Sequence, residues 1–341
     1  MTKSARDVSL AAVAAAAGVS IATASRALSG RGDLKKETRE RVLAAASEVG
    51  YNRVARPAGR PRTHDSRLIE FVLGTFDDAW TDAMMTGARK AAFALGYDLV
   101  LTLERDDPSD DWPARVATRR PSGVVLGIIQ PTHKQLDELR ALRIPIVLLE
   151  PRSEPDEALV SVGTTDWQGG YEAGRHLALS GCDRFVVLTG TPRYRFGRAR
   201  EEGFRRAIED FRPDTAVVHV ESQWSEAPVS DALVRALTGD AERIGVFACN
   251  DEMAVSVYRA AHRLGRRIPD DVSVIGFNDE PRAARLVPPL STIHQPLQEM
   301  AGRAVELVNE LHRDADAHHG RAELPSTLVL RGSTLPAGEE A

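Results

Sequence analysis

The chain has little cysteine and no long hydrophobic run. Its 341 residues include two cysteines, Cys182 and Cys249, with neither a CxxC pair nor a Cys/His cluster around them. This scarcity argues against a disulfide framework and fits a reducing compartment. No apolar run is long enough to span a bilayer, and the first residues lack the hydrophobic core of a signal peptide. We therefore expect a soluble, cytoplasmic protein.

Catalytic motifs are also missing. The sequence has no Gly-x-Ser-x-Gly elbow, no Walker loop, no Gly-x-Gly-x-x-Gly after the first apolar run and no His-Glu-x-x-His. The His- and Asp-rich stretch 312–319 resembles a metal site in composition, but we interpret it as a polar loop between a helix and a strand. No residue set supplies a nucleophile with a base. The expectation is a protein that is not an enzyme and needs neither a metal nor a cofactor.

Charge is distributed unevenly along the chain. Residues 1–62 hold twelve lysine and arginine side chains and five acidic ones, a net charge of +7. The rest of the chain holds 32 basic and 44 acidic side chains, a net charge of −12. A basic head on an acidic body indicates that the head, and not the body, meets a polyanion.

Three regions follow one another. Residues 1–50 are helical in pattern, residues 51–66 form a basic linker with proline and glycine, and residues 67–341 alternate apolar runs with helical segments. The predicted strands are 68–73, 98–103, 123–129, 145–149, 185–188, 216–220, 244–248 and 272–277. The predicted helices are 81–95, 132–142, 166–180, 198–211, 227–238 and 250–264.

Such alternation is typical of βαβ units with parallel strands buried on both faces. About 270 residues of this kind exceed one core, so we predict an α/β fold with two doubly wound lobes, preceded by an all-α N-terminal domain. Ligands of such folds bind beside the carboxyl ends of the strands. A small-molecule cleft is expected there.

The N-terminal pattern predicts a helix-turn-helix. Ser9 can cap a first helix, Gly18 can make a left-handed turn, and Ser20 can cap a second helix. The start of that second helix would enter the major groove of DNA. Its candidate contacts to bases and phosphates are Ile21, Ala22, Thr23, Ser25 and Arg26. The alternative is a plain helical hairpin in which the serines serve only as caps.

These residues, together with the blocks 250–254, 268–279 and 288–296, resemble the lactose-repressor/galactose-repressor family over essentially the whole chain. The resemblance implies a homodimeric regulator, most often a repressor, that binds pseudo-palindromic operator DNA and senses a small molecule, usually a sugar. It also implies a two-lobed effector domain of the periplasmic-binding-protein type. One departure is Lys35, which stands where the family usually has a serine cap.

The linker departs further from the family. Asn52 and Arg53 match the start of the family's hinge helix, but Pro57 would disrupt a helix that extends past it. Arg60 and Arg62 belong to Gly-Arg-Pro-Arg, which resembles the core of an AT-hook that lies in narrow minor grooves. A solvated basic linker that only releases counterions is the alternative.

Five residues at the predicted strand ends are effector-binding candidates: Trp80, Arg200, Trp224, Asn250 and Asn278. Planar polar groups suit vicinal hydroxyls, and aromatic faces suit the C–H side of a sugar ring. In the family, the positions matching the last four commonly line the pocket, with Asp where this chain has Asn278. Purely structural roles are the alternatives: Asn250 could cap a helix, Trp80 could belong to the core, and Arg200 could pair with a neighbouring Glu.

Two other functions share this architecture. A transport-type sugar-binding protein is one, but the basic helix-turn-helix argues against it. An enzyme on a doubly wound scaffold is the other. The sequence therefore favours a ligand-responsive DNA-binding regulator whose ligand shifts the lobes and thereby the affinity for DNA.

Overall fold

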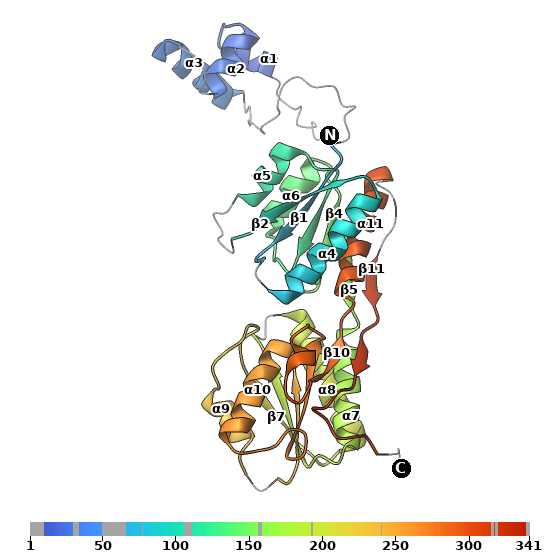
Figure 1. Ribbon diagram of the computed structural model, residues 1–341. Helices are drawn as coiled ribbons and strands as arrows, with labels where there is room; N and C mark the ends of the chain where they lie inside the picture. The colour runs from blue at the N-terminus through green and yellow to red at the C-terminus, as the bar shows by residue number, and fades with distance from the viewer. Residues whose placement is uncertain are drawn as a thin grey trace, which may run out of the picture. The chain divides into compact units, whose positions relative to one another are not determined.

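The computed structural model describes residues 10–29, 34–49, 66–76, 78–105, 111–155, 159–191, 194–239, 241–314, 317 and 320–338. Contacts between Cα atoms divide the chain into two compact units, residues 1–64 and 65–341. The first is helical and the second is α/β (Figure 1). Within the described residues no single helix is long and apolar enough to cross a membrane.

In the described part of the first unit, three helices pack around a core of small side chains. Its helices are α1 (Leu10–Ala16), α2 (Ile21–Ser29) and α3 (Lys36–Glu48). Val13, Ala24 and Val42, one from each helix, are fully buried. As predicted, Gly18 has a left-handed φ of +63° between the first two helices. Lys35 precedes α3 and makes no side-chain cap hydrogen bond, as the missing serine implies.

The first sheet of the second unit has the order β11-β5-β4-β3-β1-β2, and all its pairs are parallel. Its strands are β1 (Leu68–Leu73), β2 (Asp98–Leu103), β3 (Gly123–Gly127), β4 (Ile146–Leu149), β5 (Val160–Thr164) and β11 (Arg321–Leu324). Val125 and Val147 face one apolar cluster, whereas Val124 and Ile146 face another. Burial on both faces explains why the central strands are continuous apolar runs.

The second sheet repeats this plan with the order β12-β10-β9-β8-β6-β7. Its strands are β6 (Arg184–Thr189), β7 (Val217–Glu221), β8 (Ile244–Ala248), β9 (Val272–Asn278), β10 (Ser291–His294) and β12 (Thr327–Val329). β12 is antiparallel to β10, and the other pairs are parallel. The predicted fold class, with a helical N-terminal region and two mainly parallel sheets, is therefore confirmed.

Helices cover both sheets. They are α4 (Ala79–Ala94), α5 (Trp112–Arg119), α6 (His133–Ala141), α7 (Asp166–Leu179), α8 (Arg195–Phe211), α9 (Asp231–Ala236), α10 (Asp251–Arg263) and α11 (Leu297–Arg313), with a 3-10 turn η1 (Ala283–Arg285). In Figure 1, α11 lies beside α4 although more than 200 residues separate them. Met84 of α4 and Met300 of α11 belong to the same buried cluster over the first sheet.

The chain passes between the two lobes three times. It leaves the first lobe after β5, returns to it with α11 and β11, and ends in the second lobe with β12. The strands next to these crossings, β5, β10 and β11, were missed by the sequence analysis, as was α5. They are short, and both β10 and β11 carry polar residues where the central strands are apolar.

Candidate functional site

The start of α2 exposes the residues predicted to read DNA. The Ser20 hydroxyl accepts a hydrogen bond from the Thr23 amide at 3.1 Å, so it caps the helix as expected. Ala24 and Ala27 anchor α2 in the core. Ile21 is 54% exposed, and the remaining candidates Ala22, Ser25 and Arg26 are exposed as well. A large exposed isoleucine beside polar side chains suits contact with thymine methyls and base edges.

Not every predicted DNA contact can be placed. Ser9, Asn52, Arg53, Arg60 and Arg62 lie outside the described residues. The proposals of a helix cap, a hinge helix and an AT-hook-like element at these positions therefore stay predictions from the sequence.

A cavity of about 640 Å³ lies among the carboxyl ends of strands from both sheets of the second unit. Its lining includes residues that follow β1, β3 and β4 of the first lobe and β7, β8 and β9 of the second. The five residues predicted to bind an effector all line this one cavity: Trp80, Arg200, Trp224, Asn250 and Asn278. The volume is in the range of small-molecule sites. We call this cavity the cleft.

Arg200 is a buried ion-pair partner at the edge of the cleft. It lies on α8 and is 3% exposed. Its Nε donates to Asp166 Oδ1 at 2.8 Å, and its Nη1 donates to the Cys249 carbonyl at 2.7 Å. The guanidinium carbon is 3.6 Å from the centroid of the Phe277 ring. The alternative of a surface pair with a neighbouring Glu is therefore wrong, because the partner is Asp166 on another helix.

Trp224 forms an aromatic wall with two rings at the start of α8, those of the N-cap residue Tyr194 and of Phe196 in the first turn. Its ring centroid is 4.9 Å from that of Phe196, edge to face, and 5.7 Å from that of Tyr194. The indole Nε1 is buried and has no hydrogen-bond partner among the described residues. An apolar face with an unused donor is the arrangement by which tryptophan holds a polyhydroxylated ring. Trp80, across the cleft, is half-buried and packs against the core of the first lobe.

Glycines make room for the indole. A Cβ added at Gly190 would lie 2.3 Å from Trp224, and one at Gly197 would lie 2.7 Å from it. We expect Gly190→Ala to displace the indole and to weaken ligand binding at least about tenfold. Calorimetric titration of the variant with its sugar ligand measures this affinity. Gly320→Ala is the matched control, since a Cβ there meets nothing within 4 Å. Equal ligand affinity in the two variants would contradict this placement of Trp224.

The two asparagines have different surroundings. Asn250 Oδ1 caps α10 by accepting from the Met253 amide at 2.7 Å, while its Nδ2 donates to the Trp224 carbonyl at 2.6 Å. It is therefore a cap, as the alternative stated, and also a tether for the tryptophan loop. Asn278 has a φ of +111°, and its Nδ2 donates to Glu280 Oε1 at 3.0 Å.

The cleft is also lined by five carboxylates that the sequence did not predict: Asp78, Glu104, Glu150, Glu252 and Glu280. Glu150 directly follows β4 and accepts the Thr164 amide at 3.0 Å. Burial and the nearby Asp166 raise the pKa of Glu150 to about 8. The carboxyl group is therefore largely protonated at neutral pH and can donate a hydrogen bond. Its position at a strand end was the available signal, but the prediction considered aromatic, amide and arginine side chains only.

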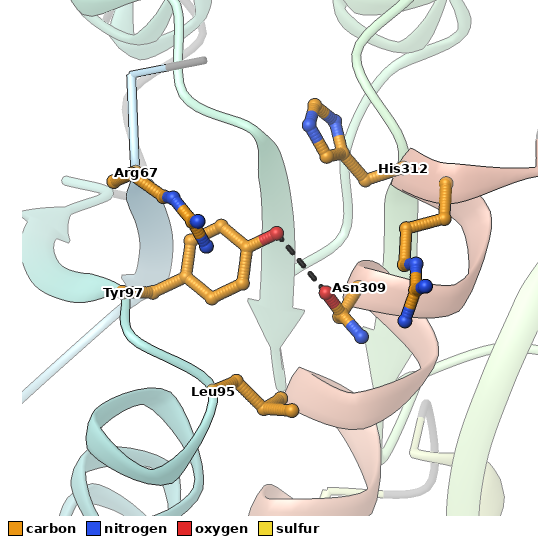
Figure 2. A pocket seen from close by; sticks show the side chains of 6 residues that line it. Arg67, Leu95, Tyr97, Asn309 and His312 are labelled. Carbon is orange, nitrogen blue, oxygen red and sulfur yellow. Dashed lines mark hydrogen bonds between the residues drawn. The ribbon is translucent and has the colours of Figure 1, made fainter.

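A second cavity, of about 470 Å³, lies at the amino ends of β1 and β2 in the first sheet (Figure 2). It contains none of the predicted residues. Arg67, His312 and Arg313 make it basic, and the buried Tyr97 hydroxyl donates to Asn309 Oδ1 at 3.0 Å. His312 and Arg313 end α11, where cations complement the partial negative charge of a helix C-terminus. We assign these side chains to helix stabilisation rather than to a ligand.

Comparison with known proteins identifies both units. Residues 9–53 match bacterial regulatory proteins, lacI family, and residues 175–334 match a periplasmic binding protein-like domain. The HTH-type transcriptional regulator MalR of Streptomyces coelicolor is 30% identical over 97% of this chain and 98% of its own. The ribose operon repressor of Bacillus subtilis is 28% identical over 94% and 97%.

Comparison with solved structures indicates the same family. The lac repressor dimer bound to operator and the anti-inducer ONPF matches with a TM-score of 0.70 and 25% identity, over 97% of this chain and 100% of that one. The helix-turn-helix geometry, the two-lobed unit and these full-length matches agree. The chain therefore belongs to the lacI family of bacterial regulatory proteins.

Proposed function

We propose that the chain is a transcriptional repressor that binds pseudo-palindromic operator DNA as a homodimer and is controlled by a sugar in the cleft. The observation that carries this proposal is the cleft itself. There Trp224, Arg200 and the two asparagines of the second lobe face Trp80 of the first. Aromatic faces and amides combined in this way suit a polyhydroxylated ring.

Relatives support a sugar as the ligand. Proteins of this fold have been solved with cellobiose, at a TM-score of 0.67, and with ribose, at 0.71. The mechanism follows from linkage. A ligand that contacts both lobes favours their closed arrangement, and any difference in DNA affinity between the two arrangements couples ligand to operator reciprocally.

The proposed function assigns a role to each region of the chain. The DNA-reading head comprises residues 1–50, the basic linker 51–66, and the effector and dimerisation unit 67–341. The protein acts in the cytoplasm, where operator DNA is accessible. We infer that it acts as a regulator rather than as an enzyme, which the transcriptional regulators among its relatives support.

Selection of genomic DNA fragments by the purified protein, repeated with a panel of sugars, tests this function. We expect a palindromic sequence to be enriched and one sugar to change its recovery. Salt-sensitive binding without sequence enrichment under every condition would contradict the proposal.

Arg26 offers a specific test of the head. We expect Arg26→Ala to weaken operator binding about 5- to 150-fold, because a side chain at a base edge contributes roughly 1–3 kcal/mol. Sugar affinity should not change, since the residue lies outside the effector unit. Arg206→Ala, an exposed arginine on α8, is the control. Loss of DNA and sugar binding together in Arg26→Ala would count against separate sites.

A further inference from the structure

Three carboxylates, one from the first lobe and two from the second, line the cleft. Asp78 caps α4 of the first lobe, Glu252 lies in the first turn of α10, and Glu280 follows β9 in the second lobe. Burial, followed by the nearby Glu252 and Asp78, raises the pKa of Glu280. All three side chains line the same cavity, so carboxylates of different lobes face one volume. We call these three residues the carboxylate corner.

Cations in the lining do not balance this charge. Apart from Glu150, whose raised pKa favours the neutral form, four carboxylates of the cleft face two guanidinium groups, those of Arg152 and Arg200. Arg200 is committed to Asp166, which is not part of the lining. Arg282 acts on Glu280, but its guanidinium donates to Glu226 at 2.6 Å. An anion that entered the corner would therefore meet net repulsion in a partly desolvated site.

An unused acceptor next to the corner points to a ligand. Asn278 is 8% exposed, and its Oδ1 has no hydrogen-bond partner among the described residues. One N–H of its Nδ2 donates to Glu280, and the oxygen is the atom of this amide left without a partner among the described residues. A buried acceptor without a donor costs about 1–3 kcal/mol, which a donor on a ligand would recover. No three His, Cys, Asp or Glu side chains in the described ranges could hold a metal ion there.

We propose that the effector presents a hydrogen-bond donor without negative charge to the carboxylate corner, and that the corner excludes phosphorylated and carboxylated sugars. Two sources supply this chemistry: a pair of hydroxyl groups of a neutral sugar, or the ammonium group of an amino sugar. The inference deepens the proposed function and rests on it. Closure brings the first-lobe carboxylate toward the second-lobe pair, so a donor between them favours closure and an anion opposes it.

The test uses the full chain with matched sets of probes. Glucose, glucosamine and glucose 6-phosphate form one set; galactose and ribose with their amino and phosphate derivatives, and cellobiose with its phosphate, form the others. Binding is measured by thermal stabilisation and calorimetry. We expect a neutral or amino sugar to bind at least about a hundredfold more tightly than its phosphate ester. The amino member of that set tells which source of donors the corner uses.

Neutral variants isolate the corner. In Glu252→Gln/Glu280→Gln the amides keep oxygen acceptors for the Glu226 amide and the Asn278 side chain. We expect this variant to reduce the discrimination against the phosphate ester about tenfold or more while still binding the neutral sugar. Glu138→Gln/Glu299→Gln is the matched control with the same change in net charge, since Glu138 of α6 is half-buried, Glu299 of α11 is exposed, and neither lines the cleft. Unchanged discrimination in the corner variant would overturn the proposal.

A second measurement covers ligands outside the panel. A cell extract is divided by anion exchange, and each fraction is tested for thermal stabilisation of the protein. Stabilisation by the unretained fraction supports the proposal, and stabilisation by the retained anions alone overturns it. Periodate cleaves the vicinal diols of sugars. A stabilising ligand that is not retained and survives periodate would therefore contradict a sugar as the ligand, but it would not contradict the exclusion of anions. If neither fraction and no probe stabilises the protein, both the proposed sugar ligand and the proposed exclusion of anions are contradicted.

Discussion

Replacement of Arg200 by methionine is expected to lower the free energy of unfolding of the effector unit by about 3–5 kcal/mol. The pair of Arg200 with Asp166 is buried on both sides, with side-chain exposures of 4% and 1%. Removal of the guanidinium leaves a carboxylate in a low-dielectric site, with the guanidinium of Arg195 3.8 Å away as a weaker ionic contact. The Cys249 carbonyl also loses a donor. Urea unfolding and calorimetry measure the change.

Two variants test the cause. In the double variant Asp166→Asn/Arg200→Met no buried charge is stranded, and we expect it to recover a substantial part of the lost stability. Arg206→Met, whose ion pairs lie on the surface, should cost less than about 1 kcal/mol. A loss below about 1 kcal/mol in Arg200→Met would show that the pair does not hold the unit together.

Replacement of Trp224 by alanine is expected to weaken sugar binding about a hundredfold and leave operator binding without sugar unchanged. The indole lies against Phe196 and Tyr194 and lines the cleft, so its removal takes away an aromatic face and opens the aromatic wall. Central aromatic residues of this kind contribute 2 kcal/mol or more to binding. A titration of the sugar found by the genomic selection, followed by calorimetry and by release of operator DNA, measures the effect.

A second tryptophan provides the control. Trp167 stacks on Tyr171 of α7 at 5.3 Å, is partly exposed and does not line the cleft. Trp167→Ala should therefore retain sugar affinity within about threefold. If both tryptophan variants bind sugar equally well, the cleft is not the sugar site. If Trp224→Ala also loses operator binding, the coupling between the units differs from the one proposed.

Local sequence patterns predicted the central strands because these strands are buried on both faces. Among them, β1 and β8 begin and end at the predicted residues. β2 also has the predicted bounds, although it is an edge strand and largely exposed, because its own sequence keeps a strand-like apolar pattern. β10 and β11 were missed because each is a four-residue strand next to a crossing between the lobes. Their place in the sheets depends on hydrogen bonding to the adjacent strands β9 and β5 rather than on a run of apolar side chains. Propensity alone does not specify such strands.

The cleft was predictable to the extent that strand ends converge. Trp224 and Asn250 follow β7 and β8, Asn278 ends β9, and the rule for open α/β sheets brings these three residues together. The pairing of Arg200 with Asp166 could not be predicted in the same way, because it depends on how α7 and α8 pack. The carboxylate corner depends on the approach of two lobes, and acidic residues in loops are too common to single it out.

The return of the chain to its first lobe has a consequence for synthesis. α11 and the edge strand β11 complete the first sheet and its apolar cluster, yet they are encoded at residues 297–324. While the ribosome is still adding these residues, the second sheet already has β6 to β9, and the helical head has all three of its helices. The DNA reader can thus fold on a nascent chain long before the sensor exists. A premature stop after β9 would release the DNA-reading head joined to an incomplete sensor, because α11 and β11 would be missing.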